Sequence, residues 1–191
     1  MAEKKAPEDK DLLDSAAELR EGDQEASRRL KMEKLVQEGI DAFPGKVKTT
    51  HSVLEIVEKF SKFSREELEE KKVKVAVPGR IVSIRRMGRA SFFHIRLQAY
   101  LREEEVGKRD YELFSLIDIG DIVAVQGVLF RTKTGELTVL VDTFTFLAKC
   151  FHPLPEKWHG LQDTEVRYRK RYLDLIMNPK EQEVFRLRSA M

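Results

Sequence analysis

The stretch from residue 73 to residue 148 constrains the fold of this chain most strongly, because most of it has the pattern of β-strands. Val73, Val75 and Val77 alternate with polar or small residues, as in a strand that buries one face. Pro78 and Gly79 then predict a break or a bulge. Further β-rich runs cover residues 81–87, 90–100, 121–131 and 136–147. The stretch therefore predicts a sheet of several short strands.

The connections between these runs narrow the fold class. Residues 132–135 (TKTG) join the last two runs, and a short connection that contains glycine is typical of a hairpin. Residues 110–119 are more helix-like, with Leu113, Leu116 and Ile117 at helical spacing. Strands, one helix and then a hairpin is the order of an OB-fold, a five-stranded Greek-key barrel. We therefore predict an α+β, mainly β chain with this barrel at 73–150, flanked by N-terminal helices and a C-terminal helical connector.

Arginine is concentrated in the first half of the predicted barrel. The whole chain has a net charge of only +2, so this concentration is a local property. No acidic residue interrupts the run, which would suit a phosphate backbone, although a solvated arginine-rich sheet face is the alternative. The run consists of Arg80, Arg85, Arg86, Arg89, Arg96 and Arg102.

Several classes of site and of location have no support in the sequence. The single cysteine excludes an intramolecular disulfide, and Cys150 and His152 have no second pair with which to hold a metal. The first ten residues are charged from the start and lack the apolar core of a signal peptide. No apolar run approaches the roughly 20 residues that span a bilayer. We therefore expect no metal site, no membrane partner and an intracellular, cytoplasmic location.

Helices are expected on the N-terminal side of the barrel. Residues 1–27 are predicted to be mostly disordered or loosely helical, and residues 28–72 to form a helical appendage. Its first helix places Met32, Leu35 and Val36 on one face. Two capping boxes, at 52–55 and 64–67, predict two short helices that pack on one end of the barrel.

The C-terminal part is expected to be a connector. Residues 151–155 should be extended because of their prolines, and Trp158 is interpreted as a packing anchor. Asp163 can cap a helix that runs to Met177. A second helix is predicted from Asn178, with Pro179 in its first turn. Its apolar face would comprise Val184, Leu187 and Met191, and the chain ends within it.

Four stretches resemble the N-terminal part of class II lysyl-tRNA synthetases, the lysine–tRNA ligases. The resemblance runs from about Arg28 to the C-terminus. The related aspartyl and asparaginyl enzymes share the barrel, but the TKTGEL hairpin favours the lysine enzyme. The stretches are 87–92 (MGRASF), 132–137 (TKTGEL), 153–161 (PLPEKWHGL) and 167–175 (RYRKRYLDL).

The resemblance implies that the barrel holds the anticodon loop of lysine tRNA. It places Phe92 under the central anticodon uridine as a stacking platform. It gives hydrogen bonds with anticodon bases to Arg85, Gln98 and Glu136. Phosphate contacts would come from Arg86, Arg89 and Lys133. Because neighbours on a strand face opposite sides, Phe93 should then lie in the core. Arg28, Arg29, Lys31 and Lys34 are interpreted as a solvated helix surface or, alternatively, as contacts to tRNA or a partner.

The same resemblance implies that residues 151–191 are a connector and the start of a truncated class II catalytic domain. We find no catalytic residue in this chain, and ATP and Mg²⁺ are expected only for the missing domain. The chain alone should bind tRNA and catalyse nothing, and the full-length family implies a homodimer. The alternatives are a standalone OB-fold that binds single-stranded nucleic acid, or a docking role for the terminal helices.

One departure from the family concerns Gln98. The family has a turn between the strands that hold Phe92 and Gln98, but residues 93–100 contain no Gly, Asn, Asp or Pro. Either the hairpin is lost, or loop residues are missing between Arg96 and Leu97, and we favour missing residues. A change of register by one residue would turn Gln98 to the other face.

Overall fold

The computed structural model describes residues 8–41, 43–154 and 163–191. The chain forms two compact units, Met1–Pro153 and Leu154–Met191. The boundary lies close to the predicted end of the barrel at residue 150. Trp158 and most of the matching stretch 153–161 lie outside the described residues.

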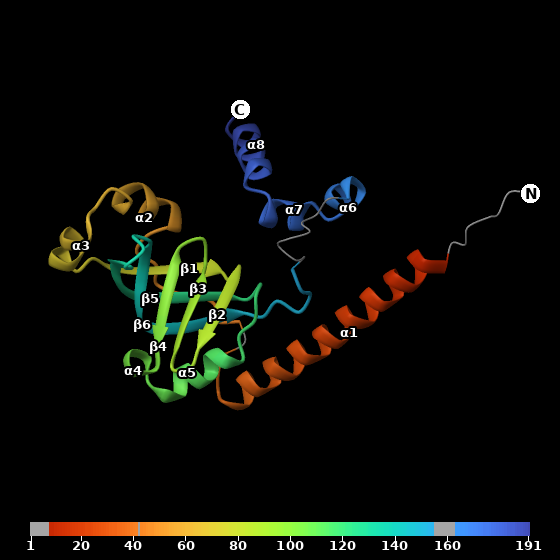
Figure 1. Cartoon of the computed structure of the whole chain (residues 1–191), viewed down its shortest axis with the longest axis horizontal. Coiled ribbons are helices and arrows are strands. Elements are labelled where there is room, and N and C mark those ends of the chain that lie inside the picture. The colour runs from red at the N-terminus through yellow and green to blue at the C-terminus, as the bar shows by residue number, and fades with distance from the viewer. Residues whose placement is uncertain (1–7, 42, 155–162) are drawn as a thin grey trace, which may run out of the picture. The chain divides into compact units, whose positions relative to one another are not determined.

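Within the described residues, six strands form a single sheet in the first unit (Figure 1). Their order is β1-β5-β6-β4-β3-β2, and every neighbouring pair is antiparallel except β4 and β6. β1 and β2 are the two outermost strands in this order, and they follow one another directly in the chain. The continuous segment that they form therefore closes the sheet into a barrel. The strands are β1 (Lys74–Arg80), β2 (Ser83–Met87), β3 (Ala90–His94), β4 (Gln98–Arg102), β5 (Ile122–Arg131) and β6 (Leu137–Ala148).

The first strand of the predicted five-stranded barrel is divided in two, but not where we expected. β1 continues through Pro78 and Gly79 in unbroken register with β5, so the prediction of a break or a bulge there is wrong. The chain changes partner at Ile81, whose N–H donates to Asp121 O at 2.8 Å, whereas the next N–H donates to His94 O. Glycine is required at 79 because a Cβ there would lie 2.6 Å from the Cβ of Ile95.

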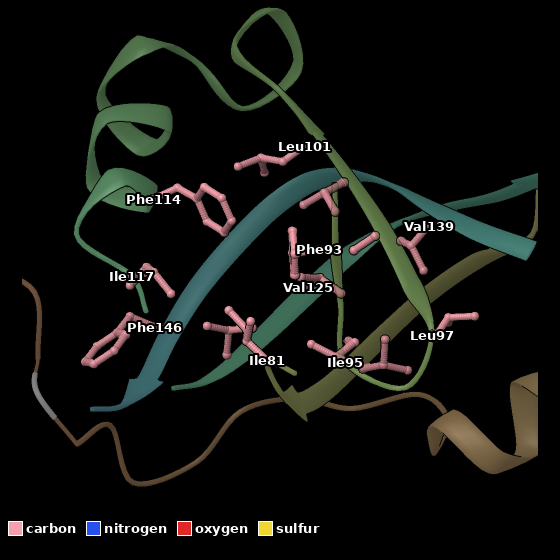
Figure 2. Close-up of a cluster of buried hydrophobic side chains, with 14 of the residues drawn as sticks. Ile81, Phe93, Ile95, Leu97, Leu101, Phe114, Ile117, Val125, Val139 and Phe146 are labelled. Carbon is pink, nitrogen blue, oxygen red and sulfur yellow. The ribbon is translucent and has the colours of Figure 1, made fainter. Parts of the chain in front are cut away.

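Part of the core lies between the strands and the helical segment that follows β4 (Figure 2), and the N-terminal helices add Met32, Leu35, Ile56 and Leu68 to it. Phe93 is fully buried whereas Phe92 is half-buried, which confirms that these neighbours face opposite sides. The Phe93 ring lies 5.0 Å from that of Phe114, a core residue that the helical spacing did not indicate. Phe114 belongs to α5 (Lys108–Ser115), which follows the short α4 (Glu103–Val106). The predicted helix at 110–119 is thus shifted toward the N-terminus.

Both capping boxes form as predicted. Ser52 Oγ accepts from the N–H of Glu55 at 3.2 Å, and the Glu55 carboxylate accepts from the N–H of Ser52 at 2.6 Å. Ser64 and Glu67 repeat this exchange. The helices they begin are α2 (Val53–Phe60) and α3 (Arg65–Lys71), which pack against β1 and β5 respectively.

The N-terminal helix is longer than predicted, and its side chains bond to the barrel. α1 (Glu8–Gln37) includes residues that we expected to be disordered or loosely helical. Arg28 donates to Ile119 O at 3.0 Å and to Cys150 O at 2.6 Å, so it is neither solvated nor available to tRNA. Lys31 pairs with Asp118 at 2.5 Å. Met32 and Leu35 are buried as predicted, but Val36 is 53% exposed.

The second unit contains α6 (Thr164–Arg169), α7 (Arg171–Met177) and α8 (Pro179–Ala190). Asp163 caps α6 as predicted, but the single helix expected up to Met177 is interrupted at Lys170. The Asn178 amide does not cap α8 and instead donates to buried Asp174 at 2.6 Å. Burial alone would raise the pKa of Asp174, but bonds from Asn178, Arg167 and Arg171 outweigh it and lower this pKa. The apolar face predicted for α8 is exposed at Val184 and Leu187.

None of the described helices is long and apolar enough to cross a membrane. Over the same residues, no group of three or more His, Cys, Asp or Glu side chains has the arrangement of a metal site.

Candidate nucleic-acid interface

A groove of about 640 Å³ lies on the barrel between β2, β3, β4 and the hairpin that joins β5 to β6. Five of the seven side chains proposed from the family resemblance line it: Arg85, Phe92, Gln98, Lys133 and Glu136. These residues are spread over more than 50 positions of sequence, and the sheet brings them together.

Strand register arranges the groove residues in two rows. Phe92 pairs with Arg85 on β2 and with Tyr100 on β4. Two residues further along β3, His94 pairs with Ser83 and Gln98, and Gln98 pairs in turn with Thr138 on β6. Residues two apart on a strand share a face, so both rows lie on the same side of the sheet.

The first row is aromatic. The Phe92 and Tyr100 rings stack with their centroids 4.3 Å apart and their planes 14° from parallel. Tyr100 thus supports Phe92 from the β4 side, whereas Arg85, which is exposed, lies on the β2 side. Phe130 extends the aromatic contacts, with its ring 6.3 Å from that of Tyr100. A half-buried ring held in this way offers a fixed face on which a base can stack.

The second row is a hydrogen-bonded chain centred on Glu136. His94 bridges two partners, with Nδ1 3.0 Å from Ser83 Oγ and Nε2 3.1 Å from Glu136 Oε1. The Gln98 amide donates to Glu136 Oε2 at 2.7 Å, and Thr138 Oγ1 donates to the Gln98 oxygen at 2.7 Å. Each carboxylate oxygen of Glu136 is therefore held by a donor from a different strand.

The hairpin that carries Glu136 is itself fixed. The N–H of Gly135 donates to Thr132 O at 2.9 Å, and the N–H of Glu136 donates to Thr132 Oγ1 at 3.0 Å. Gly135 has a φ of +84°, a backbone conformation that favours glycine. The Arg131 guanidinium donates to Gly135 O and also to Phe63 O at 2.7 Å, which ties the hairpin to the segment between α2 and α3. The hairpin predicted from the TKTG connection is thus confirmed.

Two of the proposed phosphate contacts do not line the groove. Arg86 alternates with Arg85, and its guanidinium donates to Ile117 O at 2.7 Å and lies 5.7 Å from the centre of the Phe114 ring. Arg89 lies in the turn between β2 and β3, 3.8 Å from a Glu103 oxygen. Arg80 and Arg102 also have partners within the domain, at Gly120 O and Glu105. The arginine run therefore does not form one basic surface.

A tight turn joins the two strands that carry Phe92 and Gln98. β3 and β4 are joined by residues 95–97 alone, and the Ile95 N–H donates to Leu97 O at 3.0 Å. Arg96 adopts a φ of +71°, which is uncommon outside glycine. The alternative that the hairpin is lost is wrong, and the turn closes without additional residues between Arg96 and Leu97. That residues are missing between Arg96 and Leu97 stays a prediction, and Gln98 lines the groove.

Sequence reasoning missed four residues of the two rows. His94 was detectable, because the same alternation that exposes Phe92 places residue 94 on that face. Tyr100 follows from Gln98 by the same rule. Ser83 follows from Arg85 by the same rule. Thr138 was not detectable, since its place depends on the register between β4 and β6, which are distant in sequence.

The closed sheet and its groove define an OB-fold nucleic acid binding domain, and the family of that description matches residues 75–147. The full chain is 45% identical to the lysine–tRNA ligase of Pelotomaculum thermopropionicum, of which it covers 38%. Over 87% of its length it is 48% identical to the lysine–tRNA ligase of Halalkalibacterium halodurans, of which it covers 34%. The chain is thus homologous to the N-terminal region of lysine–tRNA ligases and contains their anticodon-binding OB-fold. It spans about a third of the length of these relatives.

Proposed function

We propose that residues 73–150 recognise the anticodon loop of lysine tRNA. The observation that carries this proposal is the placement of a fixed aromatic ring beside a fixed donor–acceptor pair in one groove. Phe92 supplies the face on which the central base would stack. Gln98 and Glu136 supply the groups that meet its Watson–Crick edge.

The edge of uracil fits the hydrogen-bonding capacity that remains in the groove. A carboxylate accepts at about four positions, and Glu136 uses two of them for His94 and Gln98. It can therefore still accept the N3–H of uracil. The Gln98 amide has a second N–H that is free to donate to a uracil carbonyl. Arg85 lines the same groove as a further donor to the anticodon bases, and Lys133 supplies positive charge there for the loop phosphates.

The remaining parts of the proposal rest on the homology. The lysine–tRNA ligase reaction, with ATP and Mg²⁺, would belong to a catalytic domain outside this chain, in a homodimeric cytoplasmic protein. This chain would contribute the selection of the tRNA. A standalone OB-fold that binds single-stranded nucleic acid without regard to sequence is the alternative.

The test is binding of the full chain to a lysine-type anticodon stem-loop and to one with its central uridine replaced, at fixed salt. Both are repeated with Phe92→Ala and with Phe43→Ala, which removes an aromatic ring that is 61% exposed and outside the groove. Loss of a stacked base costs about 1–3 kcal/mol, so Phe92→Ala should weaken binding to the uridine loop roughly tenfold or more. Phe43→Ala should leave binding unchanged.

The combination of changes identifies the base that Phe92 contacts. Replacement of the uridine and Phe92→Ala should each weaken binding, and together they should weaken it little further. If both stem-loops bind equally and only salt changes the affinity, the barrel is a general electrostatic binder and the proposal fails.

A further inference from the structure

The His94 ring is held by two partners, one at each of its nitrogens. It pairs with Ser83 across β2 and β3, and its other nitrogen reaches the hairpin at Glu136. Its side chain is 37% exposed and that of Glu136 is 49% exposed, so both remain accessible from the groove. The function proposed above gives neither Ser83 nor His94 a contact with the RNA.

The partners determine which nitrogen of the neutral ring carries the proton. A carboxylate can only accept, so Nε2 must donate to Glu136, and Nδ1 must then accept from the Ser83 hydroxyl. The same reasoning orients Gln98, whose oxygen accepts from Thr138 and whose NH₂ therefore faces Glu136. The carboxylate is clamped between two donors and presents its remaining lone pairs as acceptors only.

We infer that His94 is a positioning residue that makes Glu136 select bases with a ring N–H at the Watson–Crick edge. This inference rests on the proposed function of the groove. Uracil presents N3–H to the clamped carboxylate, whereas cytosine presents a bare N3 acceptor that the carboxylate repels. Without His94, the Oε1 side of Glu136 loses its donor and the side chain can rotate away from the base on Phe92.

The test compares stem-loops that carry uridine or cytidine at the central position, bound to the full chain at fixed salt. His94→Leu should reduce the preference for uridine about tenfold, the usual effect of losing a hydrogen bond to a charged group. His94→Gln should restore most of the preference, because its amide can donate to Glu136. His51→Leu is the matched control, since His51 is a half-buried histidine outside the groove.

A double variant separates positioning from folding. In a Glu136→Gln background, His94→Leu should cause no further loss of the uridine preference, because the carboxylate that it positions is gone. Thermal unfolding of each variant shows whether the barrel remains folded.

The outcomes distinguish this inference from the function on which it rests. A wild-type chain that binds both loops equally overturns the proposed function and the inference with it. A wild-type chain that prefers uridine, with a His94→Leu variant that keeps this preference or weakens both loops alike, overturns only the role of His94. Failure of His94→Gln to restore the preference has the same meaning.

Discussion

The barrel contains two hydrogen-bonded networks, each built around a carboxylate. They differ in how many acceptor positions of the carboxylate are occupied and in how far it is exposed. In the groove, Glu136 is 49% exposed and accepts from two side chains. Where α1 meets the barrel, Asp121 and Lys149 are both fully buried. The Lys149 ammonium has three donors, and they reach Leu116 O at 2.8 Å, Asp118 at 2.7 Å and Asp121 at 2.8 Å.

The difference separates a carboxylate with a structural role from one with the proposed role in recognition. Asp121 also accepts from the N–H groups of Cys150 and Asp118, both at 2.8 Å, so three of its acceptor positions are used within the protein and its side chain is fully buried. A network that is fully buried can hold elements together, but a ligand cannot reach it. Glu136 has its position fixed and its remaining lone pairs free, which is the arrangement that recognition requires.

The largest expected effect is on stability, and it separates Lys149 of the buried network from Lys133 of the groove. Lys149→Met should destabilise the fold by about 3–5 kcal/mol, because it leaves the Asp121 charge buried without its cation. Lys133→Met, at the exposed hairpin tip, should change the unfolding free energy by no more than about 0.5 kcal/mol. Denaturant unfolding of both variants measures the contrast. Equal free energies would mean that the buried network does not stabilise the barrel.

The second prediction is that removing the groove carboxylate affects RNA binding, whereas removing the buried carboxylate affects stability. Glu136→Ala should weaken binding of the uridine stem-loop about tenfold while changing stability by less than about 1 kcal/mol. Asp121→Ala should do the reverse, lowering stability far more than Glu136→Ala does. Stem-loop binding and denaturant unfolding, measured on the same preparations, test this exchange. A large loss of stability in Glu136→Ala would show that the groove network is structural too.

The third prediction concerns pH at the edge of the buried network. Burial alone would raise the pKa of Asp118, but bonds from Lys149 and Lys31 lower it below its ordinary value of 3.8. Because the folded pKa is lower than the unfolded one, this stabilisation is complete above that value and is lost as the pH falls through the folded pKa.

Lys31→Met isolates this contribution. It should cost about 1 kcal/mol at pH 7, and its difference from the wild type should shrink below about pH 4 as Asp118 is protonated. Lys34→Met is the control, since Lys34 is an exposed lysine on the same helix. Denaturant unfolding across this pH range measures both. A difference that stays constant down to pH 2.5 would contradict the pairing.

The same contrast explains what could be predicted from the sequence. Local patterns gave the strands, both capping boxes, the hairpin and the opposite orientations of Phe92 and Phe93. Contacts between distant positions were not predictable, and Arg28 bonds to a carbonyl 122 residues away. Charge along the sequence did not indicate that Arg86 lies outside the groove that Arg85 lines. The break at Lys170 was missed because buried Asp174 binds groups on both sides of it.

The turn at Arg96 was also beyond prediction, because no residue in it favours a left-handed backbone. The smallest expected effect is a change in stability on substitution of Arg96, whose turn joins the two strands that carry His94 and Gln98. A non-glycine residue in the left-handed region costs about 1–2 kcal/mol, and glycine gives part of this back through its freer unfolded chain. Arg96→Gly should therefore be more stable than Arg96→Ala by about 0.5–1 kcal/mol.

The alanine variant is the matched control, because both variants lose the charge and differ only in what the backbone tolerates. The two should bind the uridine stem-loop equally, since the groove is fixed by register and by the Glu136 network rather than by strain in the turn. Unfolding and binding measured together decide this. A gain in stability accompanied by a loss of uridine preference would show that the strained turn helps to place His94 and Gln98, and the groove network would then depend on the turn as well.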